Sequence, residues 1–430
     1  MLGGEKYVAR KEIQETFNLC NFCIRIIGLS FIDDVPETLY EGLMTNVTLV
    51  LTSIMLVLML AGEIAYVAGQ MIHSASVEEF VGSYLHIVGY GTMSFGKLLT
   101  IWYKRHTFRQ LVVELAEIWP VTIRDKEGVE MKRNSLSALK HRQFMYAFWN
   151  ILGVWLYNLT PIAVLVYRKL RGFPSALGYV WQMAYPFDKT KPIIHGLVYV
   201  FETCSGCISV CCMLGSDLLF MTMASHISML LRLLQDQIRH LGTIESKDSL
   251  ESGSNECYKE IVEVVKIHQR LIRYINDLED AFSVVNLINV LLSSVNICCV
   301  MFTIVFLDSW MEMSNKFYLG AALTQMFVIC WYADDIYRAV SSMGVANAVY
   351  ESGWYKSNTR CRRAMLVVSL IFLLVFASDF AHRRMGNYFK CGLIYYSLFP
   401  TCFFFFKNGK SSNDIFRSGW SGRACQTLTD

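Results

Sequence analysis

Apolar residues gather in long runs that polar segments separate. A bilayer core about 30 Å thick needs about 20 apolar residues in a helix that rises about 1.5 Å per residue. Six runs reach that length, at residues 43–67, 80–103, 145–167, 193–223, 281–307 and 316–336. The pattern predicts an all-α polytopic membrane protein.

A seventh crossing is expected within residues 364–406, where one apolar stretch ends near 378 and a second covers 391–406. About seven transmembrane helices then divide the chain into segments. These are an N-terminal segment (1–42), a six-helix bundle (43–336) with helical loops at 104–144 and 225–280, a third loop (337–363), the seventh-span region (364–406) and a polar tail (407–430).

Basic residues are distributed unevenly among the loops. Lys and Arg are frequent in residues 1–42, 104–144, 225–280 and 337–363, and sparser in the loop of residues 168–191. Short loops rich in Lys and Arg stay in the cytoplasm. We therefore expect a cytoplasmic N-terminus and, after a seventh crossing, an external C-terminus, which is the reverse of a G-protein-coupled receptor. Residues 1–17 lack the apolar core of a cleaved leader, so none is expected.

Two of the predicted inner loops carry amphipathic stripes. One runs through residues 256–282 and includes Ile261, Val264, Leu271 and Leu278, and another runs through residues 227–241. Stripes at this spacing indicate helices that extend from the membrane and bury one face. The partner of that face is either the other helix of the same chain or another subunit.

Composition places the chain in the membrane class. It is 54% hydrophobic and 17% charged, against about 25% charged residues in ordinary soluble domains. A net charge of +3 without a basic stripe gives no sign of a nucleic-acid partner. The chain has no Gly-rich phosphate loop, HExxH or GxSxG motif, so we expect no enzyme activity, catalytic residue or cofactor. Cys204, Cys207 and Cys211 lack a partner His or Cys pair at metal-site spacing, so no metal is expected.

Four charged residues fall inside the apolar runs: Glu63, Lys97, Glu202 and Asp217. A charge at mid-membrane costs at least about 2.5 kcal/mol and tends to face a cavity or a partner. Lys97 is expected to reach the inner interface along its own stem, and Glu63 to reach water at the outer one. Glu202 either supplies a polar group to a ligand cavity or makes an interhelical hydrogen bond.

The predicted outer halves of the runs are rich in aromatic side chains. Cavities for small apolar ligands are walled by such side chains with a few polar groups, although aromatic residues also form a belt at membrane interfaces. The candidate ligand-binding residues are His86, Tyr90, Trp155, Tyr199, Glu202, Phe302 and Tyr318, and Tyr157 belongs to the same aromatic set.

Two local patterns resemble the insect odorant receptors over roughly residues 1–370. The first is the segment PFDKTKP at 186–192, before the fourth run. The second is the third inner loop, with Ala346, Ala348, Val349, Tyr350, Trp354, Arg362, Arg363, Ala364 and Met365.

The resemblance implies a receptor in the plasma membrane of olfactory sensory neurons. It implies a ligand-gated cation channel that forms a heterotetramer with the shared odorant receptor co-receptor, to which Tyr350 and Trp354 would contribute contacts. Small volatile odorants would bind in an outward cavity between the spans, and the lipid bilayer would surround the bundle.

After Leu370 the sequence departs from the family pattern. In that family the last span lines the pore, so we predict that this chain adds little odorant-dependent current through its own pore contribution. A gustatory receptor of the same superfamily and a membrane transporter are the alternatives. The third inner loop favours the odorant receptors over the gustatory ones, and the seven prolines of the chain give little sign of the broken helices of a transporter.

Overall fold

A computed structural model describes residues 2–30, 39–72, 85–121, 123, 125–173, 176–240, 252–304, 313–340, 342–356 and 359–367. Within these residues the regular structure is helical. The elements are α1 (Leu2–Ile26), α2 (Leu39–Ile72), α4 (Leu85–Tyr103), α5 (Arg105–Ile118), α6 (Lys126–Leu170), α7 (Pro192–His240), α8 (Ser252–Phe302), α9 (Met313–Val340), α10 (Ser342–Glu351) and the 3-10 helix η4 (Trp354–Lys356).

The described part of each of the six predicted spans falls on a helix, namely α2, α4, α6, α7, α8 and α9 in chain order. Four of the described helices, α2, α6, α7 and α8, are long and apolar enough to cross a membrane by themselves. The predicted seventh span lies outside the described residues beyond Val367, so the number of crossings stays a prediction.

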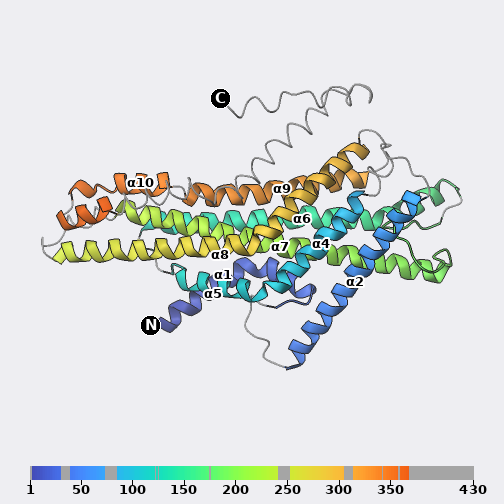
Figure 1. The fold of residues 1–430 in the computed structure, drawn as a ribbon, viewed down its shortest axis with the longest axis horizontal. Coiled ribbons are helices and arrows are strands. Elements are labelled where there is room, and N and C mark those ends of the chain that lie inside the picture. The colour runs from blue at the N-terminus through green and yellow to red at the C-terminus, as the bar shows by residue number, and fades with distance from the viewer. Residues whose placement is uncertain are drawn as a thin grey trace, which may run out of the picture.

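The longest helices lie roughly lengthwise in the molecule, and α2 and α4 are inclined to them (Figure 1). The helix α7 has 49 residues and is therefore about 74 Å long, more than twice the thickness of a bilayer core. One end of the bundle carries the loop of residues 171–191, called here the loop end. The opposite end carries α10.

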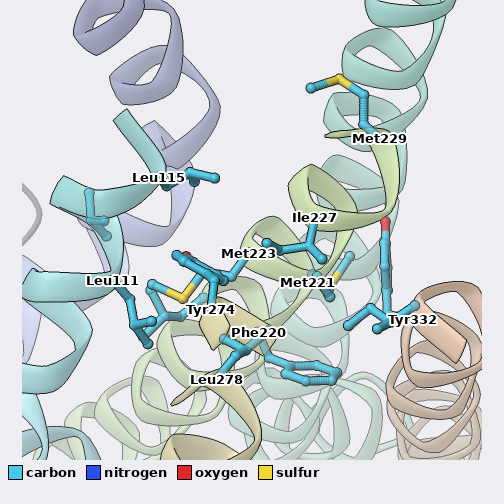
Figure 2. Close-up of a cluster of buried hydrophobic side chains, with 14 of the residues drawn as sticks. Leu111, Leu115, Phe220, Met221, Met223, Ile227, Met229, Tyr274, Leu278 and Tyr332 are labelled. Atoms are coloured by element: carbon cyan, nitrogen blue, oxygen red, sulfur yellow. The ribbon is translucent and has the colours of Figure 1, made fainter. Parts of the chain in front are cut away.

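The core is built around α7. Every residue from Cys212 to Leu231 is buried, as expected of a helix that neighbours surround on all sides. Figure 2 shows how its side chains meet those of three other helices. Leu111 and Leu115 come from α5, Tyr274 and Leu278 from α8, and Tyr332 from α9.

The amphipathic stripes predicted for residues 227–241 and 256–282 are buried within this chain. Leu230, Leu234 and Ile238 of α7 and Val264 and Leu271 of α8 belong to one core cluster. The intramolecular alternative therefore accounts for these apolar faces.

Apolar side chains also cover much of the outer surface of the bundle. Val50 and Ile54 of α2, Trp155 of α6, and Leu287 and Leu291 of α8 are about half exposed. Soluble proteins rarely expose contiguous apolar surface of this extent, whereas lipid tails solvate it without cost. The surface is that of a polytopic membrane protein.

Candidate functional site

A cavity lies between α4, α6, α7, α8 and α9, and Trp181 of the loop belongs to its wall. Its wall is aromatic and aliphatic with three amides and the hydroxyl groups of one serine and three tyrosines, which is a composition typical of small-molecule sites. The lining residues are Tyr90, Met93, Asn150, Gly153, Val154, Tyr157, Trp181, Val210, Ser293, Asn296, Tyr318, Ala321, Ala322 and Gln325.

Four aromatic rings from separate segments meet in this wall. The Trp181 ring stacks on Tyr157 at 5.4 Å and on Tyr90 at 6.3 Å between ring centroids. Tyr318 meets Tyr90 edge-on at 5.9 Å and Tyr157 at 6.2 Å. We call these four residues the aromatic box. Stacked and edge-on pairs in this distance range are mutually stabilising, so the box forms without a ligand.

Glu202 of α7 fixes the loop that carries Trp181. Its carboxylate accepts hydrogen bonds from the backbone N–H groups of Val180 (2.7 Å) and Trp181 (3.1 Å) and from the Tyr185 hydroxyl (2.9 Å). The indole N–H of Trp181 donates to the Glu202 carbonyl at 3.1 Å. Glu202 is fully buried, so these bonds form away from water. Glu202 binds a loop instead of another helix, and it is outside the set of residues that line the cavity, so its part in ligand binding stays a prediction.

The loop is also tied to α2 and folded on itself. The Ala184 N–H donates to the Gly62 carbonyl at 3.0 Å. In the PFDKTKP segment the Asp188 carboxylate accepts from the Thr190 hydroxyl and N–H, which hold the pKa of Asp188 below its ordinary value. Lys189 lies over the Tyr179 ring at 4.2 Å. The segment is thus a structured turn that leads into Pro192, the first residue of α7.

A buried ion pair adjoins Gln325, one of the residues in the cavity wall. Lys97 Nζ is 2.6 Å from Asp217 Oδ1, and both side chains are almost fully buried. Asp217 Oδ2 accepts from the Tyr146 hydroxyl at 2.7 Å and from the Gln325 amide at 3.0 Å. The expectation that Lys97 extends to an interface is therefore wrong, because the Asp217 charge is available inside the bundle.

Glu63 is the second charged residue that differs from expectation. It is fully buried, so it does not reach water, and neither carboxyl oxygen has a hydrogen-bond partner among the described residues. Its Oε2 lies 2.5 Å from the place where a Cβ at Gly91 would stand. The missing side chain of Gly91 makes room for the carboxyl between α2 and α4.

The structure brings only part of the predicted ligand-binding set together. Tyr90 and Tyr318 line the cavity. The Tyr199 hydroxyl donates to the Asn158 carbonyl, and Trp155 is 47% exposed on α6. Phe302 is half-buried at the last turn of α8 and outside the lining set. His86 lies in α4, but its side chain falls outside the described part of the chain.

Three important wall residues were absent from the predicted set: Trp181, Asn296 and Gln325. Asn296 and Gln325 are polar residues inside apolar runs, which is a signal that sequence inspection can detect. Trp181 lies in a loop with no periodic pattern, and tertiary contacts with Glu202, Tyr157 and Tyr90 hold it in the bundle.

The predicted co-receptor contacts lie near the α10 end. Tyr350 is 79% exposed on the last turn of α10, and Trp354 of η4 packs partly against the core.

The fold and the cavity together define a polytopic helical membrane protein with an aromatic-walled pocket between its helices. The 7tm odorant receptor family model matches residues 76–371, which is more than half of the chain. The chain belongs to the odorant receptor family, which is a family of receptors. The match ends close to Leu370, where the sequence departs from the family pattern.

Individual odorant receptors match about two thirds of this chain. Odorant receptor 85c of Drosophila melanogaster is 27% identical over 308 residues, which are 70% of this chain and 74% of the relative. Odorant receptor 49a of the same species is 25% identical over 277 residues, 63% of this chain and 67% of the relative.

Solved structures share the fold. The insect olfactory receptor OR5 from Machilis hrabei superposes with a TM-score of 0.70 at 14% identity, covering 91% of this chain and 98% of that one. The same receptor in complex with eugenol gives 0.68, also at 14% identity, covering 92% and 100%.

Proposed function

We propose that this chain is an odorant receptor subunit that binds small volatile apolar ligands in the cavity next to the aromatic box. The observation that carries the proposal is the box itself, which gathers rings from α4, α6, α9 and the loop around a pocket with few polar groups. Apolar surface and amide groups of this kind suit a ligand with an apolar body and at most one or two polar atoms.

The box has to open for a ligand to enter. The cavity volume is about 40 Å³, room for about three water molecules. A volatile of about ten heavy atoms needs more space, so Trp181 or a Tyr ring moves when it binds. The ligand of the Machilis hrabei relative, eugenol, is a molecule of that size and supports this ligand class.

The proposal includes a channel and a partner. With the shared co-receptor the chain forms a heterotetrameric, ligand-gated cation channel in the plasma membrane of olfactory sensory neurons, with its N-terminus in the cytoplasm. The third loop, residues 337–363, is the proposed contact region, and the exposure of Tyr350 at its surface supports a contact there.

The test of ligand binding compares two tryptophans. Trp181→Ala removes one wall of the box, whereas Trp155→Ala removes a half-exposed ring from the outer face of α6. Calcium entry is measured in cells that express each variant with the co-receptor, over a panel of volatiles that includes eugenol. We expect Trp181→Ala to shift the half-maximal concentration about tenfold, equivalent to about 1.4 kcal/mol, and Trp155→Ala to leave it in place. Equal shifts in both variants would refute binding in this cavity.

Conduction is tested separately from binding. Residues 371–430 lie outside the described residues, and we propose that they add little to the current. A chain that lacks them, expressed with the co-receptor, should keep most of the volatile-evoked calcium entry. Strong currents that disappear on this deletion would contradict the proposal and leave ligand binding untouched.

A further inference from the structure

Gln325 belongs to two sites at once. It lines the ligand cavity, and its amide N–H₂ donates to Asp217 Oδ2 at 3.0 Å and to Asn289 Oδ1 at 3.1 Å. Its side chain is almost fully buried. Both hydrogens of the amide are therefore used, and a displaced Gln325 loses two hydrogen bonds.

Asp217 is the meeting point of four helices. It lies on α7 and takes Lys97 from α4, Tyr146 from α6 and Gln325 from α9. We call these four residues the Asp217 centre. In a low-dielectric interior each donor to a buried carboxylate is worth more than in water, and a missing donor is not compensated. The loss of one donor thus requires the other partners, and the helices that carry them, to adjust.

Only one of the donors to Asp217 Oδ2 touches the cavity. Gln325 is in its wall, whereas Tyr146 is fully buried elsewhere on α6 and outside the lining set. A ligand that contacts the Gln325 amide changes the donation to Asp217. By thermodynamic reciprocity, a change at the Asp217 centre changes ligand affinity by the same factor.

We propose that Gln325 is a positioning residue that couples occupancy of the cavity to the Asp217 centre, and so to the relative placement of α4, α6, α7 and α9. The inference rests on the proposed ligand cavity. It adds the route by which the ligand acts on the bundle.

A double-mutant cycle tests the coupling. Tyr146→Phe removes one donor to Asp217 Oδ2 without touching the cavity, and Gln325→Met removes the other with a similar volume. Calcium entry of the co-receptor complex is measured with eugenol, octanol and hexyl acetate. We expect Tyr146→Phe alone to shift the half-maximal concentration about fivefold or more, and the double variant to differ from the product of the single shifts.

The matched control is Ser293→Ala, a wall residue with no bond to the Asp217 centre. The shift in half-maximal concentration of the double variant Ser293→Ala with Tyr146→Phe should equal the product of the two single shifts. An unchanged half-maximal concentration in Tyr146→Phe would overturn the coupling. So would a double variant with Gln325→Met whose shift equals the product of the single shifts. Either result leaves the proposed receptor function in place. A wild-type chain that ignores all three volatiles counts against the proposed function instead.

If the wild-type chain does not respond to any of the three volatiles, a second double-mutant cycle without ligand tests the coupling. Ala321→Leu fills the cavity with a built-in side chain, because Ala321 is in the wall. The unfolding midpoint of the purified full chain is measured for Ala321→Leu, Tyr146→Phe and both together. A non-additive change supports the coupling, and an additive one overturns it.

Discussion

Two glutamates with the same burial have opposite surroundings. Glu63 and Glu202 are both fully buried in helices of the bundle. The Glu202 carboxylate accepts three hydrogen bonds from the loop, whereas within the described part of the chain neither oxygen of Glu63 has a partner. Burial of an unsatisfied polar group costs about 1–3 kcal/mol, whereas a satisfied one holds its neighbours in place. Residue type and burial alone therefore do not decide the contribution of a buried acid.

The comparison predicts opposite changes in the unfolding midpoint when each glutamate is replaced by methionine. Glu63→Met removes two unsatisfied oxygens and should raise the unfolding midpoint of the purified protein. Glu202→Met leaves the Val180 and Trp181 N–H groups and the Tyr185 hydroxyl without an acceptor and should lower it. Thermal unfolding in detergent measures both. A fall of similar size in the two variants would show that Glu63 has a partner after all.

At the scale of elements, α1 is attached to the bundle by a small polar cluster beside an apolar stripe. Ile13 and Phe17 of α1 are buried in the main core. Glu12 pairs with Lys132 Nζ at 2.6 Å and accepts from the Trp119 indole at 2.7 Å. Burial alone would raise the pKa of Glu12, but the bonds from Lys132 and Trp119 and the Lys132 charge lower it below its ordinary value.

The lowered pKa of Glu12 gives a pH dependence with a definite sign. A carboxyl whose folded pKa is depressed stabilises the fold above its ordinary pKa of 4.5, and that contribution is lost as pH falls through the lowered value. The protection factors of the α1 amides, which correct for the intrinsic slowing of amide exchange at lower pH, should therefore fall on acidification in the wild type. This step should be missing in Glu12→Gln.

The matched control for α1 is Glu15→Gln. Glu15 lies 3.9 Å from Lys140, and both side chains are more than half exposed, so the pair contributes little. Its removal should leave the acid-induced step intact. An equal loss of the step in both variants would assign it to the net charge of α1 and not to the Glu12 contacts.

At the scale of the whole molecule, the surface divides into an apolar band and a charged end. Ion pairs join α5 to α8, α7 to α9 and α7 to α10. The aromatic box lies at the loop end, away from α10. With the basic residues gathered in the loops on the α10 side, the division favours a cytoplasmic α10 end and an external loop end.

The orientation gives a prediction for intact cells. An epitope tag placed before Met1 should bind antibody only after the membrane is permeabilised, and a tag inserted after Gly172, at the loop end, should bind without permeabilisation. Fluorescence of live and permeabilised cells measures both. Staining of the front tag on intact cells would reverse the proposed topology.

The sequence by itself determined the class of protein and the course of its helices. Length and polarity of the apolar runs predicted six helices that the structure contains, because a helix in a bilayer has to satisfy its backbone internally and cover it with apolar side chains. The stripes of residues 227–241 and 256–282 predicted buried faces. Tyr90 and Tyr318 were found as aromatic residues in the halves of the runs that face the loop end.

Only the tertiary structure decided which side chains meet. Helical spacing shows what one helix buries, but the rotation of each helix against its neighbours determines that Tyr90 faces the cavity and Trp155 faces outward. The path of a loop brings Trp181 to Glu202, and the packing of α4 against α7 brings Lys97 to Asp217. These contacts join residues more than a hundred positions apart or fix a loop without periodicity, so no local pattern in the chain encodes them.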